Sequence, residues 1–216
     1  MTNGSRERVL ARVRAALADV PADEPVERRP SERPYAESHD AGPTLDVLVE
    51  RLVDYNALVR RVAPDRVADE VAAALERCGA RRILVPAGLP EEWLSRTSVE
   101  RVVDSPEDPR DVAELDSADG VVTACTVAVA ETGTIVLDGG PDQGRRALSL
   151  VPDHHLCVVR ADQVVDAVPQ AVRRLDPLRP LTWVSGPSAT VDIEMIRVAG
   201  VHGPRTLEVV LLDPDA

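Results

Sequence analysis

The stretch Ser185-Gly186-Pro187-Ser188-Ala189-Thr190-Val191-Asp192-Ile193-Glu194 follows the apolar run Leu181 to Val184. The apolar run predicts a buried strand, and the Gly-Pro-Ser sequence predicts where that strand ends. We expect a helix to begin at Ser188, whose hydroxyl would cap its first turn. Because the first N–H groups of a helix attract anions, this junction predicts a ligand crevice. A structural cap without any ligand is the alternative.

A second block, Ala130-Glu131-Thr132-Gly133-Thr134, separates the apolar runs Val121 to Ala130 and Thr134 to Leu137. Two apolar runs so close together predict a hairpin or a tight reversal. A carboxylate at such a place is partly desolvated, which would raise the pKa of Glu131 and make it a candidate base or nucleophile. In the alternative interpretation, Glu131 is a turn residue held by the hydroxyls of Thr132 and Thr134.

Four more side chains are candidates for binding a small anion. Arg145 and Arg146 follow a glycine-rich loop at the start of an expected short helix, residues 145–150, and could clamp an anion or simply be surface charge. His202 precedes Gly203-Pro204, a loop that should bring its backbone close to a ligand or to another loop. Asp192 either faces the pocket or favours the helix dipole. His155 is interpreted as a hydrogen-bonded strand residue rather than a ligand.

The cysteines, Cys78, Cys125 and Cys157, form no Cys-x-x-Cys pair. Iron–sulfur clusters and structural zinc usually need four ligands, so we expect no metal centre in this chain. Each cysteine lies in or beside an apolar stretch, which predicts three buried, unreactive thiols.

The order of elements predicts an α/β sheet with crossovers. Residues 1–43 read as an N-terminal helix, capped by Ser5, and a proline-rich arm; residues 44–216 read as the compact domain. Within that domain we expect a long helix over 45–62, with Tyr55, Val59 and Val62 on its apolar face, and a second helix after Pro64. Further expected elements are strands at 82–86, 101–103, 155–159, 181–184 and 207–212, the last closing the sheet, and a helix from Asp162 that Pro169 kinks or restarts.

Composition narrows the class of protein. The chain has 216 residues, of which 44% are hydrophobic, but no Phe, so its core must consist of Val, Leu, Ile and Ala, as in a buried parallel sheet. A net charge of −12 and few aromatic residues argue against nucleic-acid binding. We find no signal peptide and no membrane-spanning stretch, so we expect a cytoplasmic location.

Motifs between Asp119 and Leu212 resemble the LUD-domain family of the LutC/YkgG type, called lactate utilization protein C. The resemblance rests on Ala-Glu-Thr-Gly-Thr, the Gly140-to-Arg145 loop, Pro152 to His155, Gly-Pro-Ser-x-Thr-x-Asp-Ile-Glu, and Gly-Val-His-Gly-Pro. Residue 189 is Ala where the family often has a basic residue, and Arg146 is an alternative to Arg145 as the family's arginine. The resemblance implies a Rossmann-like layered sheet flanked by helices, similar to the NagB/RpiA/CoA-transferase-like fold.

The resemblance also implies a function. Such proteins work with two iron–sulfur partner proteins to oxidise L-lactate to pyruvate, so this chain would be a non-redox subunit with no cofactor of its own. Its crevice for a small anionic ligand would involve Glu131, Thr132, Arg145, Arg146, Gly186, Ser188, Thr190, Asp192 and His202. The alternatives are a stand-alone CoA-transferase-like or sugar-phosphate-isomerase-like enzyme using Glu131, and a scaffold whose N-terminal helix and arm hold partners together.

Overall fold

The computed structural model describes residues 3–21, 36, 38–39, 42–191, 197–200 and 202–216. The chain divides into two compact units, Met1–Tyr35 and Ala36–Ala216. The first unit contains helix α1 (Asn3–Ala16), which begins before Ser5, so the expected capping role of Ser5 is wrong. Residues 22–35, most of the proline-rich arm, lie outside the described residues.

A six-stranded parallel sheet is the centre of the second unit. Its order is β1 (Leu58–Val62), β12 (Thr206–Leu212), β7 (His154–Arg160), β4 (Gly120–Thr123), β2 (Arg82–Pro86) and β3 (Glu100–Asp104). The inner strands are buried along nearly their whole length, as sheets covered on both faces require. The Rossmann-like layered α/β fold is confirmed. The last strand does not close the sheet, however, but lies between β1 and β7.

A second sheet of four strands packs on one face of the first. Its order is β8 (Val164–Val165), β5 (Val127–Val129), β6 (Thr134–Leu137) and β9 (Thr182–Val184). Strands β5 and β6 pair antiparallel, which confirms the expected hairpin. Ala128 and Ile135 face the core shared with the six-stranded sheet, whereas Val127 and Val136 face α5 (Val168–Arg174).

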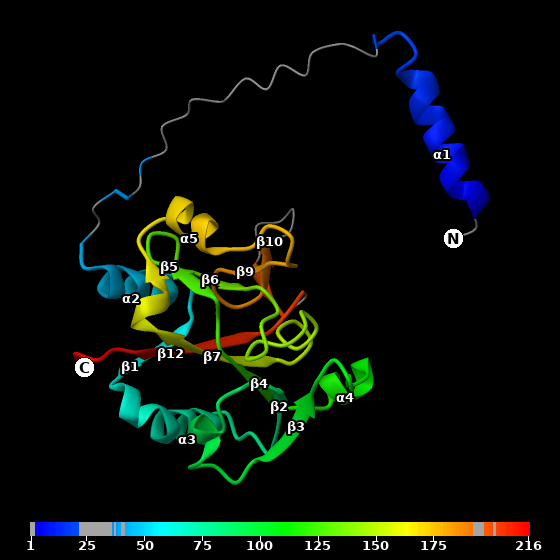
Figure 1. Cartoon of the computed structure of the whole chain (residues 1–216). Helices are drawn as coiled ribbons and strands as arrows, with labels where there is room; N and C mark the ends of the chain where they lie inside the picture. The colour runs from blue at the N-terminus through cyan, green and yellow to red at the C-terminus, as the bar shows by residue number, and fades with distance from the viewer. Residues whose placement is uncertain (1–2, 22–35, 37, 40–41, 192–196, 201) are drawn as a thin grey trace. The chain divides into compact units, whose positions relative to one another are not determined.

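Helices complete the layers. Helix α2 (Thr44–Asp54) packs into the core between the two sheets, and α3 (Val67–Arg77) covers the opposite face of the six-stranded sheet. Figure 1 shows α3 on one side of that sheet and the β5–β6 layer with α5 on the other. A short helix, α4 (Val112–Asp116), lies beside β3, and single 3-10 turns occupy Pro64–Arg66, Glu91–Leu94 and Ala161–Gln163.

Three helix predictions are wrong. The helix expected over 45–62 ends at Asp54, because Asn56 adopts a left-handed backbone (φ 65°), and Val59 and Val62 then pair with β12. Residues 145–150 form turns rather than a helix. No helix begins at Asp162: a 3-10 turn leads into β8, and α5 starts at Val168 with Pro169 in its first turn, as the restart alternative predicted.

The helix expected at Ser188 is also wrong. Residues Ala189–Val191 form strand β10, which pairs antiparallel with β11 (Arg197–Ala199). The β-branched pair Thr190-Val191 suits a strand, and this preference outweighs the capping signal of Gly-Pro-Ser. Among the described residues of this junction, 185–191, there is therefore no helix N-terminus to attract an anion.

Two motif glycines instead bring loops against the end of α2. Gly133 has a φ of 55°, and a Cβ there would lie 2.8 Å from Cβ of Arg51. Gly186 has a φ of 80°, and a Cβ there would lie 2.5 Å from Cβ of Tyr55. Only glycine combines this backbone with such close approach. In both loops the glycine serves internal packing.

None of the helices among the described residues is long and apolar enough to cross a membrane. Cys125 and Cys157 are buried, as expected, but Cys78 is exposed at the end of α3. The prediction of a buried thiol is therefore wrong for Cys78, because the helix ends there and its last turn faces solvent.

Candidate functional site

Four of the predicted ligand-binding residues line a single hollow of about 460 Å³, which we call the His155 pocket. His155 and Leu207 are the second residues of strands β7 and β12, and Arg146 comes from the segment that links β6 to β7. The loop between β9 and β10 contributes Gly186 and Ser188, and the loop before β12 contributes His202. Segments far apart in the sequence thus meet at one polar pocket.

Ser188 ties the two loops of this pocket together. Its backbone N–H donates to the carbonyl of Pro204 at 2.8 Å, and its own carbonyl accepts from the N–H of Gly200 at 2.9 Å. The hydroxyl Oγ accepts a longer hydrogen bond, 3.3 Å, from the backbone N–H of His202. The sequence analysis expected the backbone at His202 to approach either a ligand or another loop, and in the structure it approaches another loop. The side chain of His202 is exposed and lines the pocket.

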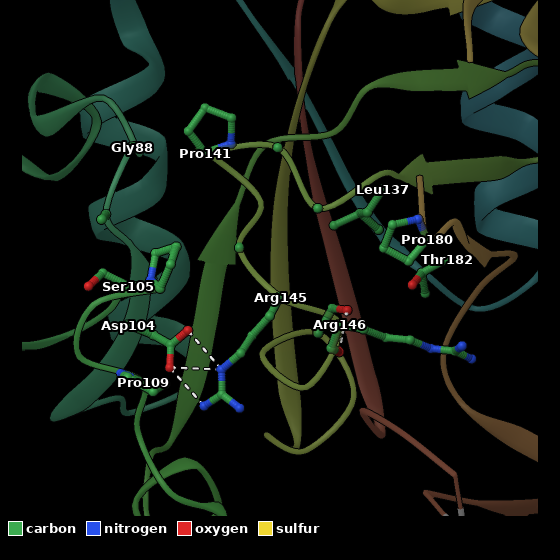
Figure 2. A pocket seen from close by; sticks show the side chains of 16 residues that line it. Gly88, Asp104, Ser105, Pro109, Leu137, Pro141, Arg145, Arg146, Pro180 and Thr182 are labelled. Atoms are coloured by element: carbon green, nitrogen blue, oxygen red, sulfur yellow. Dashed lines mark hydrogen bonds and ion pairs between the residues drawn. The ribbon is translucent and has the colours of Figure 1, made fainter. Parts of the chain in front are cut away.

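The two neighbouring arginines have different roles. Arg145 Nε lies 3.0 Å and Nη2 2.8 Å from the Asp104 carboxylate, and Arg145 also donates to the carbonyl of Arg110. Its guanidinium therefore holds strand β3 to the β6–β7 segment. Arg146 is exposed, and its guanidinium has no hydrogen-bond or ion-pair partner among the described residues. Figure 2 shows Arg145 directed at Asp104 and Arg146 extending away from it.

His155 is a residue of the pocket that the sequence analysis did not select. Its Nε2 lies 2.8 Å from Oγ1 of Thr123, which confirms the expected hydrogen bond in the strand. Its Nδ1 is buried and has no hydrogen-bond partner among the described residues. Burial, assisted by the charge of His154, lowers the pKa of His155 to about 4, so the imidazole is neutral near pH 7. A signal existed in the sequence: a histidine at the start of a buried strand, beside the arginine-bearing loop.

A second hollow adjoins the first. We call it the Asp104 pocket; it has a volume of about 530 Å³ and lies at the carboxyl ends of β2 and β3. Ligands of open α/β sheets commonly bind at this edge. Its walls are mainly apolar and include Pro106. Figure 2 shows four further apolar residues of the lining: Pro109, Leu137, Pro141 and Pro180. Arg146, Ser149 and Thr182 line both pockets, so Arg146 stands where the two meet.

Glu131 lies elsewhere, in the turn between β5 and β6, whereas Leu137 at the opposite end of β6 lines the Asp104 pocket. Its carboxylate accepts a hydrogen bond from the backbone N–H of His39 at 2.7 Å and lies 3.0 Å from His39 Nδ1. These hydrogen bonds to His39 lower the pKa of Glu131, so the expected increase is wrong. It faces a small separate hollow of about 210 Å³ with Thr44 and Asp166.

The remaining predicted residues are dispersed. Thr132 is exposed, and its hydroxyl lies 2.8 Å from that of Thr134, which in turn lies 2.8 Å from the hydroxyl of Ser185. Thr190 belongs to β10, and Asp192 lies outside the described residues. Within the part of the chain that the structure describes, no three His, Cys, Asp or Glu side chains gather as metal ligands.

A parallel sheet backed by a second sheet defines a layered α/β protein, and the His155 pocket lies between loops at one edge of it. The LUD domain model matches residues 89–212, so this chain belongs to the LUD-domain family. Lactate utilization protein C of Deinococcus radiodurans is 50% identical over 167 residues, 76% of each chain. The protein of that name from Halalkalibacterium halodurans is 30% identical over 181 residues, 77% of each chain.

Two further comparisons agree. The uncharacterized protein YkgG of Escherichia coli is 31% identical over 111 residues, 48% of each chain. The crystal structure of a DUF162 family protein from Deinococcus radiodurans superposes with a TM-score of 0.67 at 42% identity, covering 79% of this chain and 96% of that one.

Proposed function

We propose that this chain is a cytoplasmic, non-redox subunit of an L-lactate utilization system and binds a small anion in the His155 pocket. Relatives named lactate utilization protein C support the pathway. In the proposal, electrons from lactate oxidation pass through two iron–sulfur partner proteins, since this chain has only three cysteines and two of them are buried.

The guanidinium of Arg146 is the observation that carries the anion site. It lines both pockets and has no carboxylate partner among the described residues, whereas Arg145 beside it is neutralised by Asp104. An arginine without a partner can pair a carboxylate through two parallel hydrogen bonds. The imidazole of His155 lines the same pocket but is neutral near pH 7 and only 1% exposed, so in the proposal Arg146 supplies the charge that holds the anion.

Ligand-induced stabilisation tests the anion site. L-lactate, pyruvate, phosphate and acyl-CoA are each titrated while the melting temperature is measured, because a ligand that binds only the folded chain raises it. We expect a shift with small carboxylates that Arg146→Ala removes. Arg160→Ala is the matched control, since Arg160 is exposed and pairs with Asp162 away from the pocket. If the increase in melting temperature persists in Arg146→Ala, the anion binds elsewhere in the chain. If no compound raises the melting temperature, the scaffold alternative is favoured.

Reconstitution with the partner proteins tests whether this chain is needed for lactate oxidation. The chain is coexpressed anaerobically with the two iron–sulfur proteins, and lactate oxidation and cluster absorbance are measured together. We expect a complex that oxidises L-lactate and loses activity when this chain is omitted. Unchanged activity and cluster content without the chain would contradict the proposal.

A further inference from the structure

The walls of the Asp104 pocket are loops that are fastened to one another. The backbone N–H of Gly88, which follows β2, donates to the carbonyl of Pro141, which follows β6, at 2.9 Å. A Cβ at Gly88 would lie only 2.6 Å from Cβ of Pro141, so the missing side chain lets the two loops touch. Both residues line the pocket, and their contact joins two of its walls.

Two ion pairs fasten the other walls. Arg145 pairs with Asp104 at the end of β3, and Arg179 Nη1 lies 2.8 Å from the carboxylate of Asp138, the residue after β6. Arg179 immediately precedes Pro180, which lines the pocket. These bonds within the chain hold the walls of the cavity in place, and a preorganised pocket reduces the entropic cost of binding a ligand.

The Asp104 pocket is apolar along its walls and charged where the two pockets meet. Pro109 and Pro180 lie on opposite sides of it in Figure 2. The charges of Asp104 and Arg145 neutralise each other, whereas Arg146 stands at the junction and has no ion-pair partner among the described residues. A ligand that spans the junction therefore meets a cation at one end and apolar surface at the other.

Lactate is too small to use both parts of this site. The Asp104 pocket alone has a volume of about 530 Å³, within the range of cavities that enclose drug-sized ligands. Beyond its carboxylate and its hydroxyl-bearing carbon, lactate has a single methyl group. A lactate ion paired with Arg146 would therefore leave most of the apolar wall in contact with water. Each further methylene that covers this wall adds hydrophobic stabilisation, which favours a longer chain on the same head group.

We propose that the Asp104 pocket binds the aliphatic chain of a 2-hydroxy acid longer than lactate, while the carboxylate of that acid pairs with Arg146. This ligand class rests on the proposed function, which places the anion at Arg146. Leu137 and Pro180 contact the chain in the proposed complex. Lactate binds as the shortest member of the series.

Isothermal titration calorimetry of the full chain with L-lactate, 2-hydroxybutyrate and 2-hydroxyhexanoate tests the dependence on chain length. We expect the Kd to fall roughly two- to fourfold for each added methylene. The heat capacity change of binding should become more negative as the chain lengthens, because more apolar surface is buried. Arg146→Ala should weaken the binding of all three acids. If lactate binds through Arg146 but 2-hydroxyhexanoate binds no more tightly, the proposal is overturned and the anion site stands.

A variant of the wall tests where the chain lies. Pro180→Ser removes apolar surface from the pocket and should weaken the binding of 2-hydroxyhexanoate more than that of lactate. Pro177→Ser is the matched control, because Pro177 is exposed in the same loop and does not line the pocket. Equal affinities of the two proline variants for 2-hydroxyhexanoate would place the chain outside the Asp104 pocket and overturn the proposal.

Methyl NMR keeps the proposal testable if Pro180→Ser does not fold. Leu137 lines the pocket, so its methyl signals should shift with 2-hydroxyhexanoate and much less with lactate. Leu178 is 92% exposed next to Pro177, and its signals should not respond. Leu137 signals that 2-hydroxyhexanoate leaves unchanged would overturn the proposal. If Arg146→Ala changes none of the affinities, the anion site of the proposed function fails, and this proposal fails with it.

Discussion

Arg145 and Asp104 form a bidentate ion pair at the wall of the Asp104 pocket. Nε and Nη2 of the arginine lie 3.0 Å and 2.8 Å from the carboxylate oxygens. Asp104 ends strand β3 and is almost fully buried, and it also accepts the backbone N–H of Arg110 at 2.9 Å. The pair therefore fixes the segment that presents Arg146. In this way Arg145, held by Asp104, positions the neighbouring Arg146.

Replacing Asp104 by Asn should destabilise the fold. The variant keeps the shape but removes the charge that Arg145 and the Arg110 N–H bind, so we expect a loss of about 1–3 kcal/mol in the free energy of unfolding. Urea denaturation measures it. Asp153→Asn is the control, because Asp153 pairs with Arg205 on the surface and should change stability little. Equal losses in both variants would contradict a structural role for the Asp104–Arg145 pair.

Most strands of the two main sheets could be predicted from the sequence, but the strands β1, β8, β10 and β11 and several helix boundaries could not. Apolar runs such as 82–86 and 155–159 are long enough to identify buried strands without tertiary information. Val59 and Val62 fit a helical period equally well, and only their pairing with β12 decides the matter. At Ser188 the capping signal and the β-branched residues that follow it conflict, and the partner strand β11 settles the conflict.

The candidate site, too, could be predicted from the sequence only in part. Arg146, Gly186, Ser188 and His202 were predicted as ligand-binding residues, and the structure brings them to one pocket. The residue types that could bind an anion can be recognised in the sequence. The sequence does not show that Glu131 lies far from this pocket, because that separation depends on the direction in which β6 runs between them. The difference between Arg145 and Arg146 depends on Asp104, a residue 41 positions earlier that carries no motif signal.

Gly186→Ala should destabilise the chain more than Gly79→Ala. Both glycines have left-handed backbones, with φ values of 80° and 68°, so either substitution strains the chain by about 1–2 kcal/mol. At Gly79 nothing lies within 4 Å of the added Cβ, whereas at Gly186 it meets Tyr55 at 2.5 Å. The difference between the two unfolding free energies therefore measures the packing of the loop on α2. Equal losses would show that backbone conformation alone explains both.

Glu131→Gln should leave ligand-induced stabilisation intact. Glu131 accepts a hydrogen bond from His39 before the first residue of β6, whereas Leu137, the last residue of β6, lines the Asp104 pocket. The charge of Glu131 is therefore not needed to bind an anion near Arg146. The melting-temperature shift with small carboxylates should match that of the wild type. Incubation with acyl-CoA followed by hydroxylamine should give no modification at Glu131. A trapped acyl adduct at this residue would instead establish the stand-alone transferase alternative.

The stability of the chain should decrease as the pH falls from about 6.5 towards 4, in part through His155. In the unfolded chain His155 binds a proton near its ordinary pKa of 6.5, but in the folded chain burial lowers that pKa to about 4. The unfolded state therefore binds more protons in this window, and acid favours it. His154, whose folded pKa is about 9, cannot produce this loss, because its raised pKa stabilises the fold at low pH. Urea midpoints at pH 7, 6 and 5.5 measure the slope, above the range in which the carboxylates titrate. His155→Gln should flatten it; a slope that is the same in the variant would exclude His155 as its cause.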